Sequence, residues 1–131
     1  MDIVADASAV LAVVLNEAAR DSIIKRTADC RIVAPEVLPY EIGNALVVVR
    51  KKGRLSDAQV LRAYDSAQRI AVALLPVAIP RAIRLAMQFG IYAYDAYYLQ
   101  CCIENRLPLL SLDARMCEVA GKLQIRLWSE E

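Results

Sequence analysis

The sequence contains no histidine among its 131 residues. This absence excludes Ser-His-Asp and Cys-His nucleophile systems, histidine acid–base catalysis and the usual histidine-containing zinc sites. The four cysteines form no C-x-x-C pair, so zinc-ribbon or thioredoxin-like chemistry has no support, and we expect buried thiols. An enzyme of this composition working near neutral pH must therefore use carboxylates, a metal ion, lysine, tyrosine or cysteine.

Long apolar runs are missing as well. No stretch approaches the roughly 18 residues that a membrane span needs, because the longest runs are interrupted by Asp6, Asn16 and Pro76. Asp2 and Asp6 precede any lysine or arginine, which is not the pattern of a secretory signal. We therefore expect a cytoplasmic protein.

A strong net charge of one sign is also absent, because 16 basic residues nearly cancel 15 acidic residues. Any binding of nucleic acid must then come from a local basic patch rather than from the field of the whole molecule. The clearest basic run spans residues 50–54, and we interpret it as a solvated helix end. Arg106 and Arg115 follow acidic motif residues and are better placed to contact an RNA phosphate.

The residues that are present favour one folded domain over residues 1–131, since 58% of them are hydrophobic. Short apolar runs predict strands at 2–6, 31–34, 72–77, 108–112 and 125–128. Helical patterns lie between them, at 8–15, 17–28, 36–52, 56–69, 79–90, 95–105 and 113–121. This alternation predicts an α/β fold in which helices flank both faces of a central parallel sheet of about five strands.

Four acidic residues stand where such a fold would gather them. Ligands bind beyond the carboxyl ends of parallel strands, and both Asp6 and Asp113 follow a predicted strand. Glu41 lies on the apolar stripe of its predicted helix, where an unpaired carboxylate is costly. Asp95 begins the apolar stripe of another helix, near its positive end. We therefore expect the four side chains to meet at one rim of the sheet.

Such a cluster of acids indicates a metal site. Four carboxylates repel one another unless a cation neutralises them, and oxygen ligands without histidine or cysteine favour Mg²⁺ or Mn²⁺. A bound ion of this kind can activate water for phosphodiester hydrolysis. More ordinary interpretations remain open: Asp6, Asp95 and Asp113 could cap helices, and Glu41 could form a buried salt bridge. Ser8 could cap the first helix or orient Asp6.

Residues 4–9 (VADASA) resemble the opening of PIN-domain ribonucleases, especially the VapC-like toxins of prokaryotic toxin–antitoxin pairs. Further blocks follow in the order of that family, at 15–17 (LNE), 34–36 (APE), 40–46 (YEIGNAL), 94–99 (YDAYYL) and 110–116 (LSLDARM). The blocks together cover nearly the whole chain.

The resemblance implies a PIN-like three-layer α/β sandwich and Mg²⁺- or Mn²⁺-dependent endoribonuclease activity, with transfer or ribosomal RNA as the common targets. It implies that Asp6, Glu41, Asp95 and often Asp113 bind the metal. Ser111 stands where many relatives have threonine, and its hydroxyl keeps a supporting role behind the ligands. The resemblance also implies a homodimer and a cognate antitoxin that blocks the site.

Two surface features accompany this interpretation. Residues 45–49 are apolar on more than one face of their predicted helix, so we expect Val47 or Val48 to contact another chain. Four tyrosines cluster around Asp95 in the sequence, and one of them could stack on a base of single-stranded RNA. They are Tyr92, Tyr94, Tyr97 and Tyr98.

Three alternative functions remain open at this point. The first is a PIN-domain nuclease of RNA processing that has no antitoxin. The second is a phosphatase of the haloacid-dehalogenase kind, which normally has an acid two residues after its first-strand aspartate, where this chain has Ser8. The third is a non-enzymatic binding module, disfavoured because four inward carboxylates without a metal are destabilising.

Overall fold

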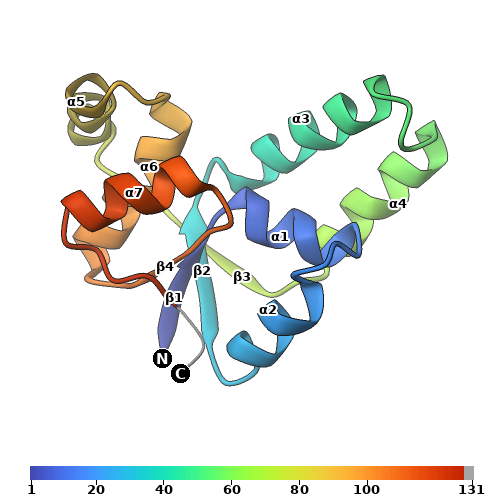
Figure 1. Ribbon diagram of the computed structural model, residues 1–131, viewed down its shortest axis with the longest axis horizontal. Coiled ribbons are helices and arrows are strands. Elements are labelled where there is room, and N and C mark those ends of the chain that lie inside the picture. The colour runs from blue at the N-terminus through green and yellow to red at the C-terminus, as the bar shows by residue number, and fades with distance from the viewer. Residues whose placement is uncertain (129–131) are drawn as a thin grey trace.

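The computed structural model describes residues 1–128, in which a four-stranded parallel sheet is covered by seven helices (Figure 1). The strands are β1 (Asp2–Ala5), β2 (Arg31–Pro35), β3 (Val72–Leu75) and β4 (Leu109–Leu110), in the sheet order β3-β2-β1-β4. The helices are α1 (Ala7–Val14), α2 (Arg20–Thr27), α3 (Leu38–Lys51), α4 (Asp57–Gln68), α5 (Ile79–Phe89), α6 (Ala93–Asn105) and α7 (Ala114–Lys122).

The helices form layers on the two sides of the sheet. In Figure 1, α5, α6 and α7 gather on the left of the sheet and α1 and α2 lie on its right. Helices α3 and α4 form a hairpin that extends to the upper right, and both pack against α1. The predicted three-layer α/β architecture is therefore confirmed. Among residues 1–128, no helix combines the length and apolar composition that a membrane crossing requires.

Strand β1 lies between β2 and β4 and is buried on both faces. Its successive side chains point to opposite sides of the sheet. Ile3 packs in the cluster that contains Ala12 of α1, whereas Val4 packs in the cluster that contains Leu99 of α6. Burial on both faces explains why the strand reads as a continuous apolar run rather than an alternating one.

The prediction of a fifth strand at 125–128 was wrong. The segment forms only an isolated bridge, between Leu109 and Leu127. Leu109 donates to the carbonyl of Arg126 at 2.9 Å and accepts from the amide of Trp128 at 2.8 Å. These two hydrogen bonds are those of a single parallel bridge, so residues 125–128 add no strand to the sheet.

The local sequence explains several helix ends. Ser56 caps α4 in a capping box with Gln59, with Ser56 Oγ accepting from the Gln59 amide at 3.2 Å. Gly90 ends α5 with φ 66°, a left-handed conformation that glycine adopts without strain. Ser8 does not cap the first helix, because α1 begins at Ala7 and its N-cap is Asp6.

The expectation of buried thiols is met in part. Cys101 and Cys102 on α6 are fully buried, whereas Cys30 and Cys117 are half-buried, and all four are free. Burial raises the pKa of Cys101 to about 11, so this thiol stays protonated near neutral pH. A protonated buried thiol is a poor nucleophile, so it packs as a small apolar side chain.

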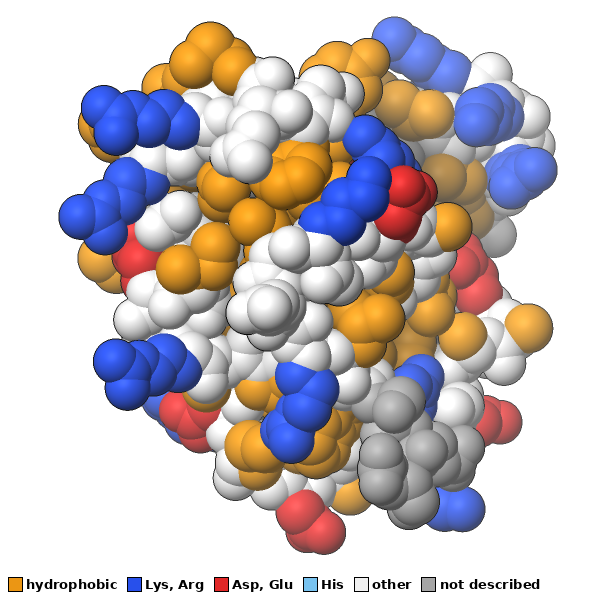
Figure 2. All heavy atoms as spheres, turned by 60° about the vertical axis from the view of Figure 1, so that its left-hand side comes forward, with side chains coloured by type: hydrophobic (Ala, Val, Ile, Leu, Met, Phe, Trp, Pro, Cys, Tyr) orange, Lys and Arg blue, Asp and Glu red, His pale blue; other side chains and the backbone are white. Residues whose placement is uncertain are grey.

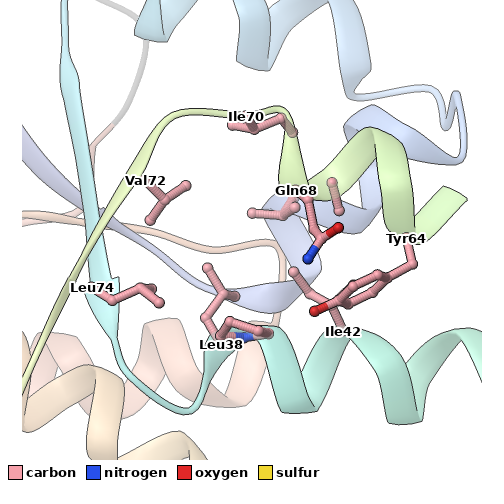
Figure 3. A pocket seen from close by; sticks show the side chains of 10 residues that line it. Leu38, Ile42, Tyr64, Gln68, Ile70, Val72 and Leu74 are labelled. Carbon is pink, nitrogen blue, oxygen red and sulfur yellow. The ribbon is translucent and has the colours of Figure 1, made fainter.

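An apolar pocket of about 230 Å³ lies between α3, α4 and β3 (Figure 3). Leu38 and Ile42 of α3 and Val72 of β3 line it, together with Tyr64 and Gln68 of α4. No aspartate or glutamate lines this pocket, so it does not carry the chemistry that the sequence predicts.

Candidate functional site

Asp6 follows β1 directly and is only 3% exposed. Its Oδ1 accepts hydrogen bonds from Ser8 Oγ at 2.6 Å and from the Ala9 amide at 3.1 Å, while Oδ2 accepts from Ser111 Oγ at 2.5 Å. Burial raises the pKa of Asp6, whereas the hydrogen bonds from Ser111, Ser8 and Ala9 lower it. The carboxylate therefore caps α1 and is held in one orientation by two hydroxyls.

The same two hydroxyls join Asp6 to the loop that leads into α7. Ser8 Oγ accepts from the Leu112 amide at 2.9 Å, and Ser111 Oγ accepts from the Asp113 amide at 3.0 Å. Each serine thus accepts from the loop after β4 and donates to Asp6. Substituting either serine would remove one of the two hydroxyl links between the carboxylate and the loop that carries the next acid.

Asp113 is the N-cap of α7, and its Oδ1 accepts from the Met116 amide at 3.0 Å. The capping interpretation is thus correct for this residue, as it is for Asp6. Capping does not exclude metal binding, because Asp113 is exposed and its Oδ2 accepts no hydrogen bond from residues 1–128. This oxygen stays available to a cation or to a water.

Glu41 lies in the first turn of α3, and its Oε1 is buried without a hydrogen-bond partner. Within the described chain it joins no ion pair, so the proposed buried salt bridge is not found there. The hydroxyl of Tyr98 is also buried and unpartnered, yet close enough to affect the carboxyl group. Burial raises the pKa of Glu41, Tyr98 lowers it, and the charges of Asp95 and Asp6 raise it further.

Asp95 is in the first turn of α6 and is half-buried. It is not the helix cap, because the N-cap is Tyr92 and no side chain makes a capping hydrogen bond. Burial raises the pKa of Asp95, and the charges of Asp113 and Asp6 raise it further. The helix dipole favours an anion at this end, which offsets part of that cost.

The structure brings the four acids into one electrostatically coupled group. The charge of Asp6 raises the pKa of Glu41 and of Asp95, and the charge of Asp113 raises the pKa of Asp6 and of Asp95. The four side chains come from the end of β1, from the first turns of α3 and α6, and from the loop before α7. Residues distant in sequence therefore share one site at the carboxyl end of the sheet.

The donor set of this group fits Mg²⁺ or Mn²⁺. Among residues 1–128, no three acidic or cysteine side chains already stand at metal-ligand spacing. Mg²⁺ keeps several waters and is commonly held by one or two carboxylates, so it does not need three direct protein ligands. Like charges also hold carboxylates apart without a cation. The unpartnered Glu41 Oε1 is the atom that a cation or its water would satisfy.

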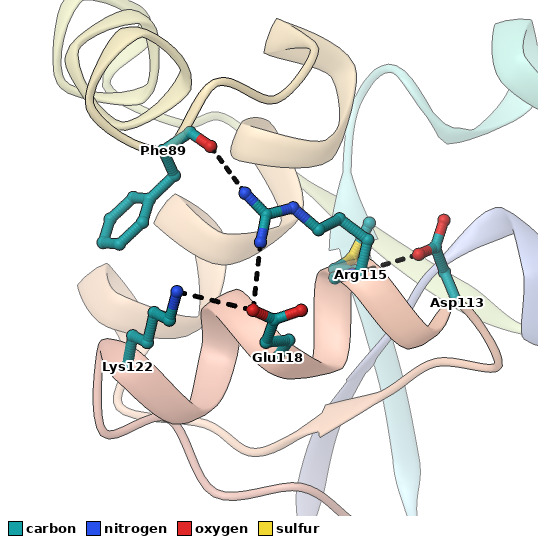
Figure 4. A network of polar contacts seen from close by, with 6 residues as sticks. Phe89, Asp113, Arg115, Glu118 and Lys122 are labelled. Atoms are coloured by element: carbon teal, nitrogen blue, oxygen red, sulfur yellow. Dashed lines mark hydrogen bonds and ion pairs between the residues drawn. The ribbon is translucent and has the colours of Figure 1, made fainter.

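The two arginines predicted to contact RNA do not point at the acids. Arg115 Nη2 donates to the Phe89 carbonyl at 2.8 Å, and its Nη1 pairs with Glu118 at 3.2 Å, toward α5 and away from Asp113 (Figure 4). Arg106 ends α6, eleven positions after Asp95, which is about 17 Å along the helix at ~1.5 Å per residue. Their contact with RNA stays a prediction that would need Arg115 to release these bonds.

Other basic side chains are scattered. Figure 2 shows lysine and arginine (blue) dispersed over the face that it presents, without one continuous patch. In the run 50–54, Arg50 pairs with Asp57, and the other basic side chains are exposed at the far end of α3 from Glu41. The interpretation of this run as a solvated helix end therefore holds.

The sequence predicted no role for Tyr40 or Asn44 at this site, and for Tyr98 only stacking on a base. Tyr40 and Asn44 line a pocket of about 380 Å³ together with Glu41, and Tyr98 faces Glu41 from α6. The sequence signal that could have pointed to Tyr40 and Asn44 is their place close to Glu41 in the motif block at 40–46. Their common pocket depends on how α3 packs near α1 and α6.

Comparisons with known proteins identify the family of the chain. Residues 3–122 match the model of the PIN domain family. A VapC ribonuclease of Mycobacterium bovis and ribonuclease VapC9 of Mycobacterium tuberculosis are each 30% identical over 116 residues, covering 88% of this chain and 89% of the relative.

Two solved structures are similar in fold. PAE2754 from Pyrobaculum aerophilum has a TM-score of 0.70 and 25% identity, over 91% of this chain and 79% of its own. VapC20 of Mycobacterium tuberculosis, described as a toxin that cleaves the sarcin–ricin loop, has a TM-score of 0.66, and the match covers 88% of this chain and 93% of VapC20. At 13% identity, the second likeness supports the fold alone.

Proposed function

This chain belongs to the PIN-domain family and resembles VapC ribonucleases, and on that premise we propose that it is a metal-dependent endoribonuclease, the toxin of a toxin–antitoxin pair. The observation that carries the proposal is the coupled group of four carboxylates, in which Glu41 Oε1 is buried without a partner. Buried, mutually repelling carboxylates are costly, so their retention at one site indicates a cation.

Asp6, Glu41 and Asp95 would hold Mg²⁺ or Mn²⁺, and Asp113 would hold it directly or through a water. When bound, the ion lowers the pKa of a water that it holds and stabilises the charge that develops on the phosphate. Asp6 cannot rotate freely, because Ser8 and Ser111 donate to its two oxygens.

The chain also offers a group for the proton that hydrolysis releases. A water oxygen bonds to phosphorus as one P–O ester bond breaks; the water gives up a proton, and the leaving oxygen takes one up to become a hydroxyl. Glu41 Oε1 would accept the proton of the water if Glu41 holds the ion through a water, because the atom has no hydrogen-bond partner within residues 1–128. Burial raises the pKa of Tyr98, so its hydroxyl keeps its proton beside Glu41.

The family match leaves one alternative, a PIN-domain nuclease of RNA processing that lacks an antitoxin. The phosphatase alternative loses its support, because the chain belongs to a different family from the one that it requires. The proposed partners are RNA, with transfer or ribosomal RNA as the expected substrates, a cognate antitoxin, and a second copy of the chain in the cytoplasm. Val47 and Val48 are exposed on α3, which suits contact with another chain.

RNA cleavage by the purified chain tests the proposal. We expect cleavage of transfer or ribosomal RNA with Mg²⁺ or Mn²⁺, loss of cleavage in EDTA, and recovery when excess Mn²⁺ is added. Hydrolysis by water leaves a phosphate monoester at one new end and a hydroxyl at the other. Cleavage that persists in EDTA, or products that end in a 2′,3′-cyclic phosphate, would contradict the proposal, because that product arises without attacking water.

A further inference from the structure

An open pocket adjoins the carboxylates on the side of α3. Its volume is about 380 Å³, and it is lined by Ala7, Tyr40, Glu41, Asn44, Ala45 and Tyr94. Ala7 follows Asp6 in the chain, Tyr94 precedes Asp95, and Glu41 itself forms part of the wall. The pocket therefore begins at the acidic group and extends away from it.

Two exposed tyrosines on different helices line this pocket. Tyr40, in the first turn of α3, is 80% exposed, and Tyr94, in the first turn of α6, is 57% exposed. Tyr94 packs edge-to-face on Tyr97, with ring centroids 6.1 Å apart and an interplanar angle of 81°, which restrains its ring. Large aromatic surfaces left in water beside a polar site are what a planar ligand would cover.

Asn44 supplies a polar group to the same pocket. Its side chain is exposed and makes no hydrogen bond within residues 1–128. A carboxamide carries both donors and an acceptor, so it can pair with the hydrogen-bonding edge of a nucleobase. Asn44 follows Tyr40 on α3 by four residues, about one helical turn. The two side chains therefore lie on the same side of the helix and on the same wall of the pocket.

We propose that this pocket binds one unpaired base of the RNA substrate, which stacks on Tyr40 or Tyr94 while Asn44 selects among bases by their edges. The inference rests on the proposed ribonuclease function and adds the group that the enzyme recognises beside the cleaved phosphate. RNA-binding proteins commonly stack unpaired bases on aromatic side chains. A net charge of +1 gives weak attraction for phosphates, so base contacts carry more of the affinity here.

Binding of short RNA tests the inference without requiring cleavage. The parent is the Asp6→Asn variant in EDTA, so that no cation takes part in binding. The probes are fluorescein-labelled hexamers of uridine, cytidine or adenosine, and binding is followed by fluorescence anisotropy. Tyr40→Ala and Tyr94→Ala should each weaken binding of the preferred hexamer by about tenfold, the order expected for one lost stacking contact. Tyr40→Phe and Tyr94→Phe should restore it, because stacking needs the ring and not the hydroxyl.

Tyr92→Ala is the matched control. Tyr92 is 82% exposed and also lies at the start of α6, but it does not line the pocket. Its replacement should leave binding unchanged. Asn44→Ala should reduce the differences among the three hexamers, and an unchanged order of affinity would refute the selecting role of Asn44.

Several outcomes would overturn the base pocket. They are unaltered binding in Tyr40→Ala and Tyr94→Ala, an equal loss in Tyr92→Ala, and failure of the parent to bind any hexamer. The fate of the proposed function is read separately, from cleavage by the unmodified chain. If binding depends on the tyrosines but the unmodified chain does not cleave RNA, the proposed ribonuclease activity is refuted and the base pocket stands. If the chain cleaves RNA but binding does not depend on the tyrosines, only the base pocket is refuted.

Discussion

Replacing Asp6 with asparagine is expected to lower RNA cleavage by at least about 100-fold, because even groups that only support a metal ligand cost about 10–100-fold when removed. The amide can still accept from Ser8 and from the Ala9 amide and can donate to Ser111, so the local hydrogen bonds survive. The lost charge removes a central attraction for the cation. Cleavage rate with Mn²⁺ and thermal melting in EDTA, measured on the same preparation, separate loss of function from loss of fold.

Asp65→Asn is the control for that substitution. Asp65 is exposed on α4 and pairs with Arg69, and it takes no part in the coupled acidic group. The control should cleave RNA like the unmodified chain and melt within a few degrees of it. Asp6→Asn cleaving at a rate close to that of the control would refute the role given to Asp6.

In the cation-free protein, Asp6, Glu41 and Asp95 are expected to make folding less favourable as the pH rises above their ordinary pKa values, the reverse of ordinary acid denaturation. Burial raises the pKa of Asp6, Glu41 and Asp95 above their ordinary values of 3.8, 4.5 and 3.8. Between those ordinary values and the raised ones, the folded state binds more protons than the unfolded state. The free energy of unfolding contributed by these groups therefore decreases as the pH rises through that window.

Urea denaturation in EDTA at several pH values measures this dependence. Glu41→Gln should increase the free energy of unfolding at pH 7 and reduce the slope, because the neutral amide removes one of the carboxylates that must shed a proton. Saturating Mg²⁺ should stabilise the unmodified chain at pH 7 and reduce the loss of unfolding free energy with rising pH, since the ion binds the deprotonated acids. A cation-free protein whose stability rises steadily with pH above the ordinary pKa values of these acids would show that burial and mutual repulsion do not raise them.

The sequence contains most of the information about the acidic group. Asp6 and Asp113 could be placed because each follows a short apolar run, and carboxyl ends of parallel strands share an edge. Glu41 could be placed because helical periodicity is a local property and marks it on an apolar stripe. The coupling among these residues is what the structure adds, together with the absence of any compensating ion pair for Glu41 within residues 1–128.

Features that depend on non-local packing were not predictable in the same way. Residues 125–128 are apolar enough for a strand, but pairing depends on the partner edge, and only the single bridge between Leu109 and Leu127 forms. Arg115 follows the Asp113 motif, yet its guanidinium turns to the Phe89 carbonyl, which only the packing of α7 near α5 brings within reach. The pocket between Tyr40 and Tyr94 likewise joins two helices distant in sequence.

The central claim is that side chains of Asp6, Glu41 and Asp95 trap a divalent ion, and Mn²⁺ located by anomalous scattering in crystals tests it most directly. We predict a peak among these carboxylates, within about 2.4 Å of an oxygen of at least one of them, that disappears in Glu41→Gln or Asp6→Asn crystals. Manganese found only at other positions of the unmodified chain, or none at millimolar concentration, would contradict the claim.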